Sequence, residues 1–343
     1  MRGFLLGLAT ALLGSGLAAT HSVRLEGIRH EYQRLNNCGP ATLAMSLSFW
    51  GSRLTQYQTA PALKPNRADK NVSPSEMAAY ARAQGFGVHQ GLAGDLALLK
   101  RLLAAGYPVI AQTWFVSDQG GMGHYRLLTG YEESGAYFRA FDSYNGPDIR
   151  LGYGELDRLW QVYNRTYLVV YPASRQAAVA GLLGQRLAPG FESQRALGVA
   201  RQEVQRQPAD GFAWFNLGSS LLEAGDAAGA AAAFDRARSA PVNRSFDPDR
   251  PPGAGGNWPW RTLWYQFGPY AAYYGTGRYA EVVSLTSQTL GKAPDHEESY
   301  YWRARARMAL GQTEAARADL RAALRHRPGF AEARSLLSGV ASR

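Results

Sequence analysis

The chain has 343 residues, of which 46% are hydrophobic, 19% charged and 12% aromatic, and these proportions exclude an intrinsically disordered protein. Its length predicts two or more domains. The formal charge of +10 comes from Arg residues spread through Ala- and Leu-rich segments, without a Lys/Arg run, a zinc finger or an RNA-binding motif. We therefore predict no nucleic-acid partner.

The N-terminal segment, residues 1–19, has the composition of a secretory signal peptide. Arg2 precedes an apolar stretch at 4–13, and small residues follow through Ala18 and Ala19. The apolar stretch is short for a membrane span, and no later segment is long and apolar enough, so we predict no membrane span in the mature chain. The sequence thus predicts an exported protein, periplasmic or extracellular; an uncleaved N-terminal anchor is the alternative.

Residues 24–171 predict a domain in which helices precede strands. Helical spacing follows Pro40, a capping box with Pro at the first helical position begins at Ser73, and a third helix is expected at 96–105. The later segments are rich in β-branched and aromatic residues and are separated by Gly/Ser turns, which indicates strands. The expected strands are 107–115, 124–131, 136–142 and 166–171, with a short helix at 153–160. This order is typical of an α+β fold with an antiparallel sheet.

Cys38 is the only cysteine, and it directly precedes Gly39, Pro40 and the first apolar helical pattern. An unpaired cysteine in an exported chain indicates an intermolecular bridge or a functional thiol, although a buried structural cysteine is the alternative. A helix N terminus stabilises a thiolate through its dipole and amide groups. A cysteine nucleophile further needs a general base and donors for the oxyanion.

His124 is the best-placed candidate for the base, because it opens a predicted strand after the Gly-rich turn 119–123. The next strand ends at Asp142, and the short turn between the two strands predicts a hairpin that brings this carboxylate near His124. A structural histidine and a turn-capping aspartate are the alternatives. The other histidines lie near the processed end, in a turn region or in the repeats described below; they are His21, His30, His89, His296 and His326.

The segment 33–45, QRLNNCGPATLAM, resembles the active-site opening of the family-39-like cysteine peptidases, relatives of the double-glycine leader-processing peptidases on the papain-like fold. The resemblance covers residues 28–171. It implies a papain-like cysteine peptidase domain at 24–171 and four roles: Gln33 as oxyanion donor, Cys38 as nucleophile, His124 as base and Asp142 as the residue that orients the base.

Metal and cofactor chemistry have no sequence signature in this chain. One cysteine and dispersed histidines, without a His-Glu-x-x-His pattern, do not form a ligand set. There is also no phosphate loop and no dinucleotide fingerprint. We therefore predict no metal and no cofactor.

Residues 172–192 become rich in Ala, Gly and Gln and predict a linker or connecting helix, and residues 193–343 predict an all-α tetratricopeptide repeat solenoid. Trp, Leu, Gly, Ala, Phe and Pro residues recur at the positions typical of this repeat. The expected repeats lie near 211–242, 263–294 and 297–328, and a Pro/Gly-rich insertion at 243–260 interrupts their period. Such solenoids commonly bind peptide segments on their concave face, although a spacer role is the alternative.

Together these features predict an exported cysteine peptidase that hydrolyses peptide bonds through a Cys-His-Asp triad. Its fold class would be an α+β papain-like domain followed by an all-α tetratricopeptide solenoid. The substrate would be a peptide or protein, and the repeats would recruit a protein partner. Two alternatives remain open: a catalytically inactive peptide-binding module, and another papain-fold acyl transferase or amidase.

Overall fold

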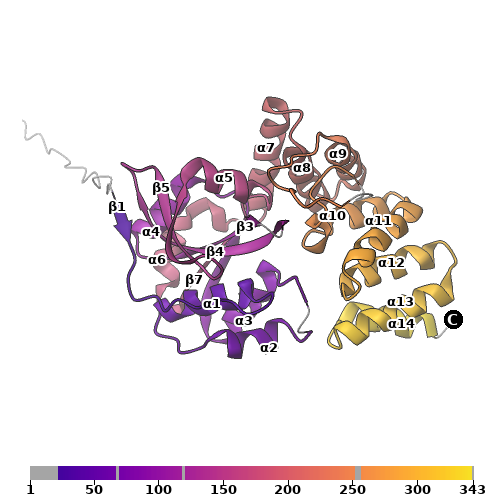
Figure 1. Ribbon diagram of the computed structural model, residues 1–343, viewed down its shortest axis with the longest axis horizontal. Coiled ribbons are helices and arrows are strands. Elements are labelled where there is room, and N and C mark those ends of the chain that lie inside the picture. Colours follow the sequence, from indigo (N-terminus) through magenta and orange to yellow (C-terminus); the bar gives the residue numbers. More distant parts are fainter. Residues whose placement is uncertain (1–21, 67–68, 118–119, 252–255, 342–343) are drawn as a thin grey trace, which may run out of the picture.

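The structure, a computed structural model, describes residues 22–66, 69–117, 120–251 and 256–341. The chain forms two adjoining lobes, an N-terminal lobe of helices and strands and a C-terminal lobe of helices (Figure 1). The predicted signal peptide lies outside the described residues. Within the described ranges, none of the helices combines the length and the apolar character that a bilayer crossing needs.

The N-terminal lobe contains a seven-stranded antiparallel sheet with the strand order β2-β7-β3-β4-β5-β6, and β1 pairs with β4. The central strands β3 and β7 are apolar and buried along most of their length. The strands are β1 (Ser22–Arg24), β2 (Phe86–Gly91), β3 (Val109–Ser117), β4 (Gly120–Glu132), β5 (Tyr137–Asp142), β6 (Gly146–Gly152) and β7 (Tyr167–Pro172). The predicted antiparallel sheet is confirmed.

Helices cover both faces of this sheet. Neighbouring residues of a strand point to opposite faces, so they pack against different helices. On β3, Ile110 packs in the cluster that holds the buried residues of α1 and α3, whereas Val109 packs in the cluster that holds the leucines of α4. The helices of this lobe are α1 (Cys38–Phe49), α2 (Gln56–Leu63), α3 (Pro74–Ala83), α4 (Leu96–Ala104) and α5 (Tyr153–Gln161).

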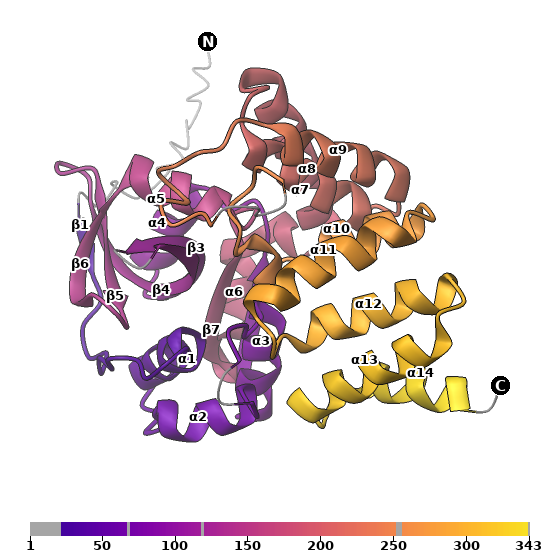
Figure 2. The same cartoon turned by 45° about the vertical axis from the view of Figure 1, so that its right-hand side comes forward.

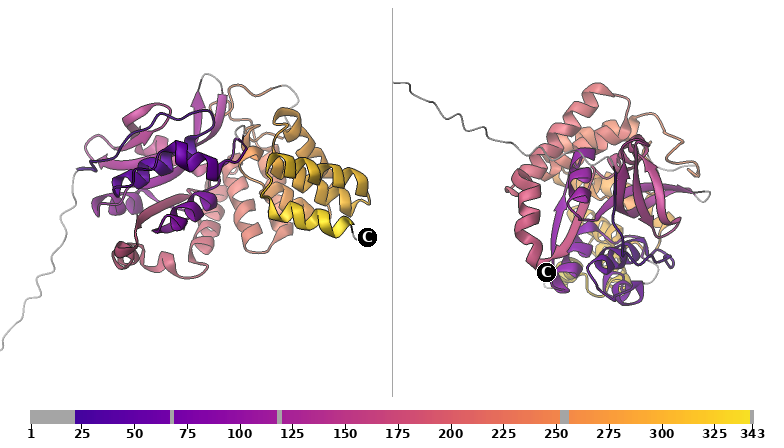
Figure 3. Two further views of the ribbon diagram at one scale, coloured as in Figure 1. Left: turned by 90° about the horizontal axis from the view of Figure 1, so that it is seen from below. Right: turned by 90° about the vertical axis from the view of Figure 1, so that its left-hand side faces the viewer.

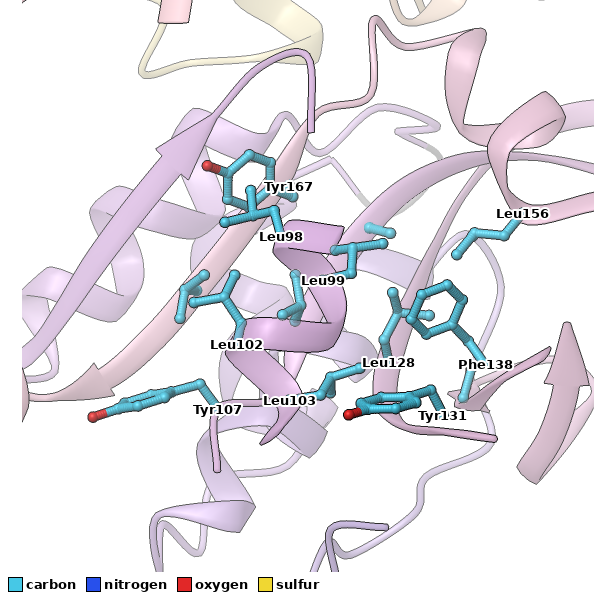
Figure 4. Packing of buried hydrophobic residues seen from close by; sticks show 14 of the residues in the cluster. Leu98, Leu99, Leu102, Leu103, Tyr107, Leu128, Tyr131, Phe138, Leu156 and Tyr167 are labelled. Atoms are coloured by element: carbon cyan, nitrogen blue, oxygen red, sulfur yellow. The ribbon is translucent and has the colours of Figure 1, made fainter. Parts of the chain in front are cut away.

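Helix α4 shows how sequence spacing produces this packing. Its side chains Leu98, Leu99, Leu102 and Leu103 recur at helical spacing, and each is at most 1% exposed. Figure 4 shows them pointing toward Leu128 and other residues of the sheet. Burial of each leucine contributes up to about 2 kcal/mol. Asp95 precedes the helix and accepts a hydrogen bond from the Leu98 amide at 2.7 Å, which caps its N terminus.

The C-terminal lobe is a series of antiparallel helices, each packed against the next (Figure 2). Gly225, Gly277 and Gly311 follow the first helix of successive pairs, and each has a positive φ, which explains why glycine recurs there. The helices are α7 (Phe191–Arg206), α8 (Gly211–Glu223), α9 (Ala227–Ser239), α10 (Gly268–Gly275), α11 (Tyr279–Lys292), α12 (Glu297–Ala309), α13 (Thr313–His326) and α14 (Ala331–Ala341). Helix α6 (Gln176–Leu183) and two short 3₁₀ helices, Ala173–Arg175 and Gly184–Leu187, lead from the sheet to α7.

Three features differ from the sequence-based expectations. Gly120–Gly123 belong to strand β4, so the predicted Gly-rich turn is wrong over these residues. His89, expected in a turn, lies on β2. Strands β1, β2 and β6 and helix α2 were not expected. Strands β2 and β6 lie at the sheet edges and combine glycine with polar residues, which weakens their strand pattern.

The two lobes contact each other beside the hairpin of β3 and β4 and beside α3 (Figures 2 and 3). The Trp114 indole donates to the Phe246 carbonyl at 2.8 Å, which joins the hairpin to the segment between α9 and α10. The ion pair of Glu76 with Arg327, 2.7 Å long, joins α3 to the end of α13. The repeats therefore lie against the sheet lobe and do not extend away from it.

Candidate active site

Cys38 is the first residue of α1, and its side chain is half-buried. The preceding loop is held by buried polar groups. Gln56 accepts a hydrogen bond from the Arg34 amide at 2.7 Å, and the Lys64 ammonium donates to the carbonyls of Leu35 and Asn36 at 3.0 and 3.3 Å. The predicted position of the thiol at a helix N terminus is confirmed.

His124 lies on β4, and Asp142 is the last residue of β5. The strand register pairs Arg126 with Asp142, so the carboxylate lies on the strand next to the imidazole. The His124 Nε2 atom is 3.0 Å from the Asp142 Oδ1 atom. Since Nε2 contacts Asp142, the other ring nitrogen is left for the Cys38 thiol, which lines the same pocket as His124. The hairpin predicted from the sequence brings these two side chains together as expected.

Opposing effects set the charge of the His124–Asp142 pair. Burial lowers the pKa of His124, but the negative charge and hydrogen bond of Asp142, followed by those of Cys38, raise this pKa above its ordinary value. Burial raises the pKa of Asp142, but His124, Arg126 and the Asn145 amide hold it well below its ordinary value. The arrangement favours a protonated imidazole beside an ionised carboxylate.

Arg126 is a site residue that the sequence interpretation missed. Its Nε atom donates to Asp142 Oδ2 at 3.0 Å, and its Nη1 atom donates to the Thr113 hydroxyl at 2.5 Å. The guanidinium is buried, with 3% of the residue exposed. Arg126 follows His124 by two positions on one strand and therefore shares its face, so strand alternation could have identified it. Arg126 fixes the carboxylate that orients the imidazole.

Gln33 lies in the loop before Cys38 and is anchored to the residue that follows Asp142. The Ser143 hydroxyl donates to the Gln33 side-chain Oε1 atom at 2.8 Å, and the backbone amide of Gln33 donates to the Ser143 carbonyl at 2.8 Å. Because Oε1 accepts this bond, the Nε2 group is the part of the side chain that can donate elsewhere.

The pocket at the thiol is formed by both lobes. Its lining from the sheet lobe includes Cys38, Gln112 and His124, and Tyr265 comes from the C-terminal lobe. Gln112, 7% exposed, lies on β3 opposite Tyr125 and was not expected from the sequence.

Of the other histidines that the structure describes, His30 lies beside the site; His21 lies outside the described residues. His30 lies near the processed end of the sequence, and its Nε2 atom is 2.9 Å from the Asp142 carbonyl oxygen. His89 contacts the Tyr167 hydroxyl at 3.1 Å, and His296 caps α12. Among the described residues, no group of three or more His, Cys, Asp or Glu side chains has an arrangement suited to a metal ion.

Two separate parts of the chain match known protein families. Residues 25–168 match the Peptidase_C39 like family, and residues 273–339 match the tetratricopeptide repeat. A double glycine motif protease from an AMS/PCAT transporter, solved with its leader peptide, is 22% identical, covers 44% of this chain and 95% of its own, and has a TM-score of 0.35. The peptidase domain of Streptococcus ComA is 16% identical, with 43% and 99% covered and a TM-score of 0.36.

A solved structure of MamA from Desulfovibrio magneticus RS-1 is 16% identical, covers 49% of this chain and 85% of its own, and has a TM-score of 0.36. No curated protein matches the chain. The predicted fold class is confirmed for both lobes. Residues 25–168 form an α+β domain that resembles the Peptidase_C39 like family, and the helices of the second lobe match the tetratricopeptide repeat at 273–339.

Proposed function

We propose that this chain is an exported cysteine peptidase whose nucleophile is Cys38. The observation that carries the proposal is the linked series of Cys38 at a helix N terminus, His124 beside it and the buried Asp142 behind the imidazole. An imidazole held between a thiol and a carboxylate is the arrangement that activates cysteine for acyl transfer. The composition of residues 1–19 supports export.

In the proposed reaction, the Cys38 thiolate attacks the carbonyl carbon of a peptide bond. The Gln33 Nε2 group and the Cys38 amide would donate to the oxyanion that forms. The His124 imidazolium gives its proton to the departing amine, which leaves an acyl group on the sulfur. His124 then takes a proton from water, the resulting hydroxide attacks the thioester, and the acid product leaves with the thiolate restored.

Asp142 and Arg126 hold the imidazole in the orientation that this reaction needs. Since Asp142 contacts Nε2, the remaining ring nitrogen can exchange its proton with the sulfur and the leaving group. The repeats support a second part of the proposal, the recruitment of a protein partner, because stacked helix pairs of this kind commonly present peptide-binding surfaces.

The test combines hydrolysis of a mixed peptide library with alkylation of the single cysteine in the full chain. Cys38→Ser and His124→Ala should each lower the rate of hydrolysis by about 10²- to 10⁴-fold, whereas His326→Ala, in the last turn of α13, should leave it unchanged. His124→Ala should also slow alkylation by iodoacetamide at pH 6 by at least about tenfold, because the imidazolium stabilises the thiolate.

Three results would contradict the proposal. Equal alkylation rates for the wild type and His124→Ala at pH 6 would exclude the thiolate–imidazolium pair. The absence of library cleavage by every form of the chain would favour a peptide-binding module. Trapping of acyl groups on an added amine in preference to water would indicate a transferase.

A further inference from the structure

Tyr265, from the C-terminal lobe, is part of the pocket that contains the thiol of the N-terminal lobe. It lines the same pocket as Cys38 and His124. A Cβ atom placed on Gly123 would lie 3.1 Å from two carbons of the Tyr265 ring, so the ring packs directly on the residue before His124. Burial, and next the charge of the Cys38 thiolate, raise the pKa of the Tyr265 hydroxyl.

Little space remains above the thiol with Tyr265 in this position. The pocket holds about 10 Å³, which is the room that one water molecule needs. A peptide substrate must bring a carbonyl carbon to the Cys38 sulfur and place residues on both sides of the scissile bond. A peptide therefore needs more room at the thiol than this pocket offers, and Tyr265 is the lining residue that comes from the C-terminal lobe.

Glycines on β4 allow the C-terminal lobe to approach this closely. A Cβ atom on Gly120 would lie 1.9 Å from the Asp249 carboxyl, and one on Gly121 would lie 2.2 Å from the Phe246 carbonyl oxygen. The glycines before His124, which the sequence analysis assigned to a turn, thus leave room for Phe246 and Asp249 of the C-terminal lobe.

Residues 257–266, which we call the cap, are held by polar contacts with the hairpin, with the end of α5 and with Asp249. The Arg261 guanidinium donates to the Gly121 carbonyl at 2.9 Å and pairs with Asp249 at 2.9 Å. The Gln266 amide donates to the Val162 carbonyl at 3.0 Å. These contacts hold Tyr265 beside Gly123, the residue before His124.

The cap is also tied to the repeat helices. The His296 Nε2 atom, at the N terminus of α12, is 3.1 Å from the Trp264 carbonyl oxygen. Asp295 pairs with Lys70 of the sheet lobe at 2.6 Å, and the Lys70 ammonium lies 5.7 Å from the centre of the Trp264 ring. A displacement of the α12 N terminus would therefore pull on the residue before Tyr265.

We propose that Tyr265 closes the catalytic pocket of the free protein and that the repeat lobe opens it by displacing the cap. The inference rests on the proposed peptidase function for its biological meaning, but closure of the pocket can be measured without any hydrolysis. Lids that exclude solvent and complete or block a site commonly control enzyme turnover.

The test measures how fast Cys38 is alkylated in the full chain by iodoacetamide and by a bulky biotin-maleimide, with total mass as the readout since the chain has one cysteine. Tyr265→Ala should accelerate the bulky reagent by at least about tenfold and iodoacetamide by less, because the larger molecule needs more of the pocket. Tyr265→Phe keeps the ring and should react like the wild type. Tyr279→Ala, a half-buried tyrosine of α11, is the matched control.

A second variant protects the test against misfolding of Tyr265→Ala. Asp295→Asn removes the pair with Lys70 but leaves Tyr265 and its packing surface unchanged, and it should accelerate the bulky reagent severalfold. Rates equal to the wild type for both folded variants would overturn the inference. Faster labelling of the variants without peptide cleavage by any form would support closure by the cap and contradict the peptidase function. Peptide cleavage by the wild type with unchanged labelling of the variants would support the peptidase function and contradict closure by the cap.

Discussion

Replacement of Asp142 by Asn tests the charge arrangement behind the candidate base. Asp142 has no exposed surface and receives hydrogen bonds from His124 and Arg126, and Arg126 is itself 3% exposed. The variant leaves a buried guanidinium without a carboxylate. Breaking a buried pair in this way costs about 3–5 kcal/mol, and because Asn keeps one acceptor oxygen we expect a loss near 3 kcal/mol in the free energy of unfolding.

The assay is chemical denaturation of the full chain at pH 7, followed by tryptophan fluorescence, as a double-mutant cycle with Arg126→Met. The double variant leaves neither charge buried and should recover at least half of the loss. A change below about 1 kcal/mol for Asp142→Asn, or additive effects in the cycle, would refute the reasoning.

The pH dependence supplies a second check on the same variant. The pKa of Asp142 is held below its ordinary value of 3.8 in the folded state. Its contribution to stability is therefore fully present above this ordinary value and is lost as the pH falls toward the lowered one. Asp142 also raises the pKa of His124 above 6.5, so the difference in stability between the wild type and Asp142→Asn should grow as the pH falls from 8 to 5, and it should shrink below pH 4 as Asp142 is protonated.

Two further predictions concern Gly123 and Glu297. Gly123→Ala places a Cβ atom 2.5 Å from the Tyr163 hydroxyl and should lower the free energy of unfolding, measured by thermal denaturation, by about 1–3 kcal/mol. Gly154→Ala is the control, because no atom lies within 4 Å of its added Cβ atom, and it should not lower the stability. Equal effects of the two substitutions would contradict the packing argument. Burial, and next the charge of Asp69, raise the pKa of Glu297 to about 7, so this carboxyl destabilises the folded state progressively as the pH rises from its ordinary pKa of 4.5 through 7. Glu297→Gln should stabilise the protein by about 2 kcal/mol at pH 8 and by little at pH 4, and a benefit independent of pH would show that the charge is not responsible.

The sequence by itself determined the local elements of the candidate site. The apolar run after Cys38 predicts α1, and the paired strands that end at Asp142 predict the hairpin that carries His124. These features depend on side-chain periodicity and turn residues within short stretches of chain. Such patterns can be recognised in the sequence without knowledge of tertiary contacts. The repeats were recognisable for the same reason, since their glycines recur where each helix pair needs a positive φ.

Only the tertiary structure decided what surrounds these elements. Tyr265 reaches Cys38 because three glycines of β4 leave room for a segment far along the chain, and no periodic pattern encodes that complementarity. His30 also lies beside Asp142 through a contact that is distant in the sequence, since it belongs to a loop with no periodic pattern. Local patterns specify which face of an element is buried. The partner on that face depends on the shape and charge of the whole folded surface.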